Sequence, residues 1–294
     1  MQNFHISNLK GTGIAIVTPF TASHDIDYNT LSALIEYWIK GKADYLVVMG
    51  TTGESVTLSK SEKTDLFNFV AEKVSGRMPV VLGLGGNNTL NLIDQLQDFD
   101  LQKATAILSV SPYYNKPTQE GIYQHYKAFA NESPLPVIVY NVPGRTGSNI
   151  LPETTLRMAG DIEKIAGVKE ASGNMEQIMQ IISRRRPDFL VLSGDDAITL
   201  PLMAAGADGV ISVVANAFPF EFSEMVRLAA DNKLQEARQY HYRLLTLIQY
   251  LFVEGNPAGI KAVMHLKSLC EPHLRLPLTP VSETLIQKIK KVID

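Results

Sequence analysis

The most constraining feature of this sequence is a series of eight short apolar runs rich in Val, Ile and Leu. Each run is mostly continuous rather than alternating, which is typical of parallel strands buried on both faces. The starts of the runs lie far enough apart for a crossover helix to follow each strand. The expected strands are Ile14–Phe20, Tyr45–Thr51, Val80–Gly85, Ala106–Tyr113, Val137–Pro143, Ile165–Ser172, Phe189–Asp195 and Gly209–Asn216.

The segments between these runs carry the signals of helices. Ser59 is followed three residues later by Glu62, which is the pattern of a capping box at a helix N-terminus. Pro152 suits the first position of a helix. We expect helices over Asn29–Lys42, Ser59–Val74, Thr89–Lys103, Thr118–Ala130, Pro152–Ala159 and Met175–Ser183.

Eight alternating strand and helix units predict an α/β fold, a (β/α)₈ TIM barrel. An open doubly wound sheet is the alternative, but its glycine-rich dinucleotide fingerprint is missing. No strand-like run recurs beyond Pro219, so we expect a barrel over residues 1–224 and a C-terminal helical domain over 225–294. The helices expected there are Glu221–Asp231, which would close the barrel, Lys233–Phe252, Pro257–Leu269 and Val281–Val292.

Charge and cysteine content exclude several classes of protein. The chain has 27 basic and 30 acidic residues and a net charge of −3, which gives no electrostatic case for a nucleic-acid or anionic-membrane partner. Cys270 is the only cysteine, so no intramolecular disulfide can form. Met1–Gly11 has no apolar segment of the signal-peptide kind, and no long apolar run occurs elsewhere. We expect a cytoplasmic protein.

Lys169 is the most informative single residue. The active site of a TIM barrel lies at the C-terminal ends of its strands, and Lys169 follows Ile165–Val168 near the end of a buried strand. Burial lowers the pKa of an ammonium group, and the neutral amine is the form that attacks a ketone to give a Schiff base. A lysine that extends to solvent or pairs with a carboxylate would occupy the same position. Position alone leaves both interpretations open.

Three further strand-end features suit an anionic keto acid, although each also has a simpler explanation. Tyr140, one strand earlier, could move protons, or could be a core tyrosine. Thr51 and Thr52 could bind a carboxylate with hydroxyl and backbone N–H groups, or could cap a helix. Arg145 could clamp a second carboxylate, or could be a surface residue.

Signals for a metal site are weak. Asp195 and Asp196 could hold a divalent metal, but capping of the next helix explains them more simply. The six histidines are scattered, without the spacing of a zinc site. We therefore expect no metal.

Several motifs together resemble one family. Gly50–Glu54, Tyr140–Pro143 and Gly167–Asn174 are similar to motifs of the dihydrodipicolinate synthase / N-acetylneuraminate lyase family. The similarity extends over essentially the whole chain, including Val17–Phe20 and Phe252–Pro257. It implies a lyase that condenses pyruvate with L-aspartate-4-semialdehyde on the diaminopimelate route to lysine. It also implies a covalent imine in place of any cofactor.

The resemblance assigns a role to each matching residue. Lys169 would form the imine with pyruvate, and Tyr140 would transfer protons. Thr51 would link Tyr140 to Tyr114, which would reach in from a neighbouring subunit. The remaining assignments are that Thr52 and Ile211 hold pyruvate, Gly194 lines the pocket and Arg145 binds the carboxylate of the aldehyde.

Two further expectations follow from the same resemblance. The alternative activity is N-acetylneuraminate lyase or another 2-keto-acid aldolase, but those relatives usually carry Ser-Thr in place of Thr51-Thr52 and lack an arginine at the position of Arg145. Members of the family are commonly homotetramers built from tight dimers, which we expect here. Members inhibited by lysine have histidines and a glutamate where this chain has Lys60, Lys63 and Asn91, which suggests weak or absent feedback by lysine.

Overall fold

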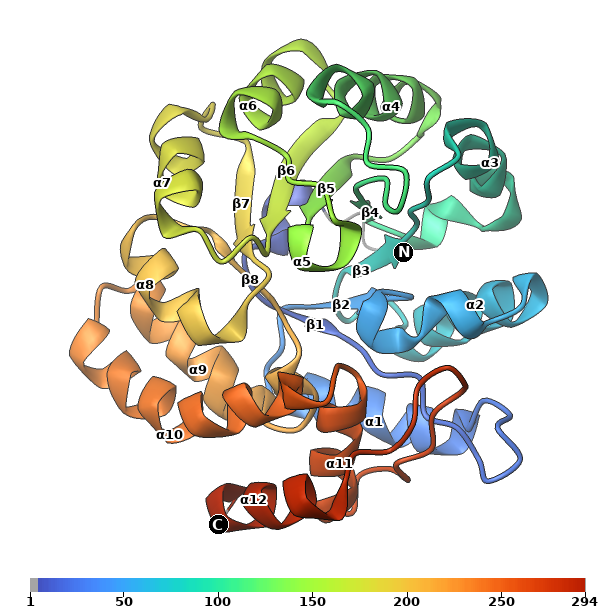
Figure 1. Cartoon of the computed structure of the whole chain (residues 1–294), viewed down its shortest axis with the longest axis vertical. Helices are drawn as coiled ribbons and strands as arrows, with labels where there is room; N and C mark the ends of the chain where they lie inside the picture. Colours follow the sequence, from blue (N-terminus) through green and yellow to red (C-terminus); the bar gives the residue numbers. More distant parts are fainter. Residues whose placement is uncertain (1–4, 294) are drawn as a thin grey trace.

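A computed structural model describes residues 5–293, so the first four residues of the Met1–Gly11 segment lie outside the described part. Eight parallel strands form a closed barrel in chain order, with β1 paired to β8 (Figure 1). The expected TIM barrel is therefore confirmed. The strands are β1 (Gly11–Ala15), β2 (Tyr45–Val48), β3 (Val80–Gly83), β4 (Ala106–Val110), β5 (Val137–Asn141), β6 (Ile165–Glu170), β7 (Leu190–Ser193) and β8 (Gly209–Ser212).

Helices surround the barrel and continue beyond it (Figure 1). The barrel helices are α1 (Tyr28–Lys40), α2 (Lys60–Val74), α3 (Thr89–Asp94), α4 (Gln119–Glu132), α5 (Pro143–Thr146), α6 (Pro152–Asp161), α7 (Met175–Arg184), α8 (Thr199–Ala204) and α9 (Pro219–Ala230). The C-terminal helices, drawn in orange to red, are α10 (Leu234–Val253), α11 (Ala258–Leu266) and α12 (Glu283–Ile293). Helix α9 contacts β1, α1 and α10, so it closes the barrel and also joins the barrel to the extension.

The division of the chain between barrel and extension depends on α9. A boundary at 224/225 lies inside this single helix, so the two parts meet without a linker, and the division stays a proposal. Among residues 5–293, no helix is both long enough and apolar enough to cross a bilayer.

Apolar side chains fill two layers. Successive residues of a strand point to opposite faces, so Val47 packs inside the barrel with Leu108 and Ile138. Leu46 and Val48, on either side of it, pack against the helices. A strand buried on both faces explains why the apolar runs are continuous rather than alternating.

The predicted first strand is misplaced. The strand begins at Gly11 and ends at Ala15, so the prediction of Ile14–Phe20 overlaps it by two residues. Gly11 and Gly13 interrupt the apolar run, so the start of the strand is not recognised by its apolar residues. The packing nevertheless requires glycine at both positions. A Cβ at Gly11 would lie 2.2 Å from the carboxylate of Asp44, and one at Gly13 would lie 2.1 Å from the ring of Tyr45. The other predicted strands overlap the observed strands but run on into buried or half-buried segments beyond the strand ends.

The predicted helices are mostly confirmed. Ser59 and Glu62 form the expected capping box, and Pro152 occupies the first turn of α6. The prediction of one helix over Thr89–Lys103 is wrong, since α3 ends at Asp94 and short 3₁₀ turns follow. Helix α8 was not predicted, because its six residues are too few to show a periodic pattern.

Candidate active site

Lys169 and Tyr140 are paired neighbours on β6 and β5. Both side chains are buried, with 5% and 8% of their surface exposed. The Nζ atom of Lys169 lies 4.3 Å from the centroid of the Tyr140 ring. The strand register thus places an amine beside a phenol near the C-terminal ends of the strands, where the fold has its reactive end.

The surroundings of Lys169 favour the neutral amine. The pKa of this ammonium group is lowered from 10.5 to about 7, chiefly by burial and also by the positive charge of Arg145. The negative charge of Asp196 acts in the opposite direction. With a pKa of about 7, roughly half of the amine is neutral at pH 7, so it can act as a nucleophile.

Tyr140 has the opposite tendency. Burial raises the pKa of its phenol, and the charge of Arg145 and the side chain of Thr51 offset this only in part. The phenol therefore holds its proton at neutral pH. It can donate that proton to an oxygen or accept one in return, which is general acid–base chemistry.

Gly194 makes room for the lysine side chain. A Cβ at this position would lie 3.0 Å from Cε of Lys169 and 2.7 Å from Cβ of Ala171. The backbone N–H of Gly194 donates to the carbonyl of Glu170 at 2.6 Å, which fixes this approach. A side chain at position 194 would therefore displace Lys169.

The turn after β2 is held from distant parts of the chain. Thr51–Gly53 form a 3₁₀ turn, and the side chain of Thr52 is 2% exposed. Nδ2 of Asn256 donates to Oγ1 of Thr52 at 3.0 Å, and Oγ1 of Thr18 donates to the carbonyl of Gly53 at 2.7 Å. Both threonine hydroxyls of the turn are thereby kept at one end of the barrel.

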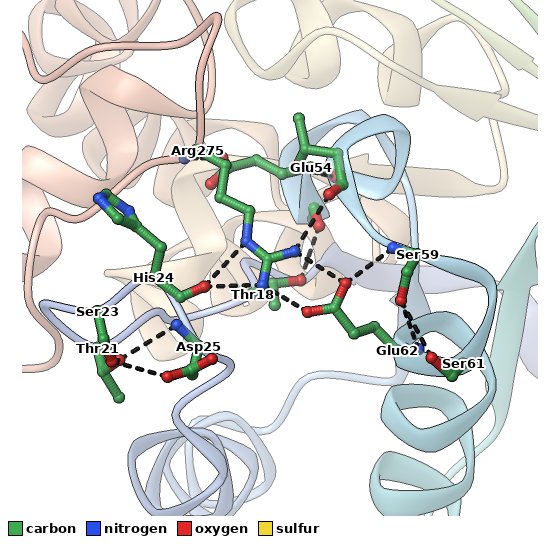
Figure 2. A network of polar contacts seen from close by, with 12 residues as sticks. Thr18, Thr21, Ser23, His24, Asp25, Glu54, Ser59, Ser61, Glu62 and Arg275 are labelled. Atoms are coloured by element: carbon green, nitrogen blue, oxygen red, sulfur yellow. Dashed lines mark hydrogen bonds and ion pairs between the residues drawn. The ribbon is translucent and has the colours of Figure 1, made fainter.

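A buried ion pair completes this anchor. Glu54 follows the turn with φ of 53°, and its side chain and that of Lys261 are fully buried. Nζ of Lys261 donates to Oε1 of Glu54 at 2.6 Å, and the backbone N–H of Arg275 donates to Oε2 at 3.1 Å. Figure 2 shows the guanidinium of Arg275 between Glu62 and the carbonyl of His24. It donates hydrogen bonds to both groups. The C-terminal extension thus fixes the turn after β2.

One cavity of about 980 Å³ connects most of the expected site residues. Arg145 is exposed and lines this cavity, so its guanidinium is accessible to a ligand in it. The expected residues that line it are Lys169, Tyr140, Thr51, Thr52, Arg145 and Gly194. Amine, phenol, hydroxyl and guanidinium groups in one cavity can bind a keto acid and a second anion.

Two expected residues lie elsewhere in this single chain. Ile211 on β8 is 1% exposed and packs with Tyr140 in the barrel interior, but it does not line the cavity. Tyr114 is 88% exposed and has φ of 74°. Its expected role requires a neighbouring subunit.

The aspartates after β7 have different roles. Asp195 accepts from the N–H of Ala197, which is the expected cap. Asp196 does not cap this turn but accepts from the N–H groups of Val213 and Val214, at 3.0 and 2.7 Å. Sequence reasoning missed the effect of Asp196 on Lys169. The only sequence signal for it was the position of Asp196 just after β7. Among residues 5–293, no group of three His, Cys, Asp or Glu side chains is arranged for a metal ion.

The cavity also extends to helices α2 and α3. Lys63 on α2 and Asn91 on α3 line this outer part. Lys60 does not line it and is paired with Asp98 at 2.7 Å. Of the two lysines, only Lys63 therefore faces the cavity, whereas Lys60 binds Asp98.

Comparison with known proteins decides the family. The family model of the dihydrodipicolinate synthetase family matches residues 8–294. The chain belongs to the dihydrodipicolinate synthetase family. Its place in this family agrees with the barrel, the strand-end lysine and the motifs from which the resemblance was inferred.

Relatives in the dihydrodipicolinate synthetase family are similar over nearly their whole length. The 4-hydroxy-tetrahydrodipicolinate synthase of Flavobacterium psychrophilum is 50% identical over 95% of both chains. That of Parabacteroides distasonis is 50% identical over 97% of this chain and 96% of its own. The chloride-inhibited dihydrodipicolinate synthase of Acinetobacter baumannii, solved with pyruvate, has a TM-score of 0.94 at 38% identity and covers 97% of this chain and 98% of its own.

Proposed function

We propose that this protein is a 4-hydroxy-tetrahydrodipicolinate synthase, a lyase that condenses pyruvate with L-aspartate-4-semialdehyde on the diaminopimelate route to lysine. The family and the two relatives at 50% identity support this activity. The single observation that carries the mechanism is a buried lysine with a pKa near 7 beside a protonated tyrosine.

The reaction begins at Lys169. Its neutral amine adds to the keto carbon of pyruvate to give a carbinolamine, and loss of water gives the imine. Tyr140 donates the proton that the departing oxygen needs and accepts one later in the cycle. Loss of a proton from the pyruvate methyl group gives an enamine, whose carbon attacks the aldehyde. Because the imine takes up the electron pair, no further cofactor is needed in this proposal.

Two anion sites suit two anionic substrates. The hydroxyl of Thr52 and the turn that carries it would bind the carboxylate of pyruvate, with Gly194 lining the pocket and Ile211 supporting it from the barrel interior. Arg145 would bind the carboxylate of the aldehyde with its planar guanidinium. Thr51 would pass protons between Tyr140 and the Tyr114 of a neighbouring subunit.

A substrate comparison tests the proposed function. We expect condensation of pyruvate with L-aspartate-4-semialdehyde and no cleavage of N-acetylneuraminate by the same preparation. Arg145→Lys keeps the charge but loses the paired donors, and it should raise the KM for the aldehyde more than the KM for pyruvate. Cleavage of N-acetylneuraminate without condensation would select the alternative activity.

Assembly and location are part of the same proposal. A homotetramer of two tight dimers would cover the exposed ring of Tyr114 and bring it to the neighbouring site. A biosynthetic enzyme of this kind would work in the cytoplasm, with no nucleic-acid or membrane partner. Sedimentation of the purified protein would measure the assembly directly.

Feedback by lysine should be weak. Lys63 lines the outer part of the cavity, so a cationic ligand would meet a like charge there, and Asn91 supplies no compensating carboxylate. We expect little inhibition of the unsubstituted protein at millimolar lysine. The double variant Lys63→His/Asn91→Glu should be inhibited more strongly. Strong inhibition of the unsubstituted protein would contradict this expectation.

A further inference from the structure

A second polar layer lies directly behind the Lys169–Tyr140 pair. Asn141 follows Tyr140 and Glu170 follows Lys169, and the two are partners in the strand register. Because side chains alternate along a strand, both point away from the barrel interior. Both are fully buried, and Nδ2 of Asn141 donates to Oε1 of Glu170 at 2.6 Å. One hydrogen bond thus joins the two strands one residue beyond the reacting groups.

Glu170 accepts four hydrogen bonds, all from neutral groups. Its Oε1 also accepts from Nε2 of Gln177 at 2.8 Å. Its Oε2 accepts from the N–H of Ser172 at 3.1 Å and from the Ser172 hydroxyl at 2.6 Å. A carboxylate buried among neutral donors costs stability compared with an apolar residue. This cost points to a requirement for geometry at this position.

The same network reaches the segment that carries Arg145. Oδ1 of Asn141 accepts from the N–H of Ile150 at 3.0 Å, and its Nδ2 also donates to Oδ1 of Asn149 at 2.8 Å. These bonds fasten the end of the 142–150 segment to β5. Nδ2 of Asn149 donates to Oε1 of Gln177 at 2.8 Å. Four side chains, Asn141, Asn149, Gln177 and Glu170, therefore form a closed ring of hydrogen bonds.

We propose that Asn141 and Glu170 are positioning residues that fix Lys169, Tyr140 and the Arg145 segment relative to one another during the reaction. The proposal rests on the proposed function. Neither residue lines the cavity, so neither would contact substrate. Because Glu170 faces away from Lys169 on the outer side of β6, we expect it to act through geometry.

The direction of the hydrogen bonds provides a sharp test. Glu170→Gln keeps one acceptor oxygen only, so its NH₂ group opposes either the donors of Asn141 and Gln177 or the N–H of Ser172. Asn141→Asp places a second carboxylate against Glu170. In the double variant the introduced amide donates to the introduced carboxylate, its oxygen accepts from Ser172, and rotation of the amides of Gln177 and Asn149 reverses the remaining bonds. Each single variant therefore leaves part of the network unmatched, whereas the double variant can reform it.

We expect each single variant to lower kcat about 10- to 100-fold, as a misplacement of about 1 Å does. The KM for pyruvate should stay within about twofold, because the Thr52 turn on β2 is outside the ring, whereas the KM for the aldehyde should rise. The double variant should regain most of the lost kcat. The pH below which kcat/KM falls should be the same in all three variants as in the unsubstituted protein.

A matched control separates positioning from stability. Asp208 lies at the opposite end of the barrel with 11% of its side chain exposed, where it accepts from the N–H of Val191 at 2.9 Å and pairs with Arg185 and Lys10. Asp208→Asn should lower the melting temperature and leave kcat unchanged. All kcat values are divided by the concentration of folded protein, measured by circular dichroism, so unfolded protein does not count.

Single variants with the kcat of the unsubstituted protein, or a double variant no better than the singles, would overturn the positioning role. If the larger changes prevent folding, Ser172→Ala serves in their place. It removes only one of the four donors to Glu170, so we expect a smaller loss of kcat. An unsubstituted protein that condenses the substrates but traps no pyruvate would instead overturn the proposed imine.

Discussion

At Lys169, burial and two neighbours act on one ammonium group in different ways. Its pKa is lowered to about 7, chiefly by burial and against the charge of Asp196, and Gly194 leaves the space that the side chain occupies. The pKa of Asp196 is itself raised by burial to about 6. Asp196 is therefore mostly charged at pH 7 and loses its charge as the pH falls toward 6, so its titration overlaps that of Lys169.

The pH dependence of activity should follow Lys169. The protonated amine does not attack pyruvate, so kcat/KM should fall with decreasing pH through about 7 and level off above it. Asp196→Asn removes the charge that raises this pKa, so the limb should move to lower pH. The exposed Asp188→Asn serves as the control. If kcat/KM of Asp196→Asn falls at the same pH as in the unsubstituted protein, or at a higher pH, the charge of Asp196 does not raise the pKa of Lys169.

Gly194→Ala should displace the amine without unfolding the barrel. The added Cβ would meet Cε of Lys169 at 3.0 Å, and we expect kcat/KM to fall about 10- to 100-fold, since catalysis depends on placement. Gly160→Ala in α6 is the matched control, because a Cβ there meets nothing within 4 Å. Equal activity of the two variants would show that the space beside Lys169 is not required.

At the scale of elements, the C-terminal extension acts on the barrel through its contacts with one turn. Asn256 binds Thr52, and Lys261 and Arg275 bind Glu54, so residues more than 200 positions apart meet beside the cavity. The left-handed backbone of Glu54 is unusual for a residue with a side chain. These contacts hold it in place.

Removal of Lys261 should cost much more than removal of a surface charge. Lys261→Met leaves the carboxylate of Glu54 buried without its partner, so we expect the free energy of unfolding to fall by about 3–5 kcal/mol. Glu54→Gln in the same chain should recover part of this loss. Arg77→Met breaks an exposed pair with Glu36 and should change little. Urea unfolding measures all of these variants, and equal midpoints for Lys261→Met and Arg77→Met would refute the anchor.

The sequence predicts those parts of the site that depend on a single strand. Lys169 and Tyr140 could be found because each lies near the end of an apolar run, and the rule for barrels then places both at one end. The contact between Asn256 and Thr52 could not be found, because nothing local to either residue encodes their meeting. The ring around Glu170 needs the strand register as well, since a shift of one residue would reverse which side chains face inward.

At the scale of the whole molecule, the exposed residues around the cavity suggest that one chain is incomplete. Val56, Leu90 and Tyr114 are 84%, 74% and 88% exposed and lie in the segments that follow β2, β3 and β4, with Leu90 in the first turn of α3. Exposed apolar side chains gathered at one end of a protein are typical of an interface. A second copy of the chain would cover them and bring the partner's tyrosine to the site.

Subunit complementation tests this arrangement. Lys169→Ala and Tyr114→Phe should each lose most activity alone. When the two variants are refolded together, some mixed dimers should contain one site with both Lys169 and a partner tyrosine intact, so activity should return. Mixing of folded homodimers without exchange is the control. Refolded mixtures of verified heterodimers that stay inactive would place the tyrosine and lysine of one site in the same chain.

The central claim is that one buried amine captures pyruvate, and covalent trapping measures this directly. Incubation with pyruvate and borohydride, followed by peptide mapping by mass spectrometry, should find a single reduced adduct at Lys169. No adduct should form in Lys169→Arg, in the absence of pyruvate, or well below pH 7 at short times. An unchanged mass in a preparation that condenses the two substrates, or an adduct at another lysine, would contradict the account.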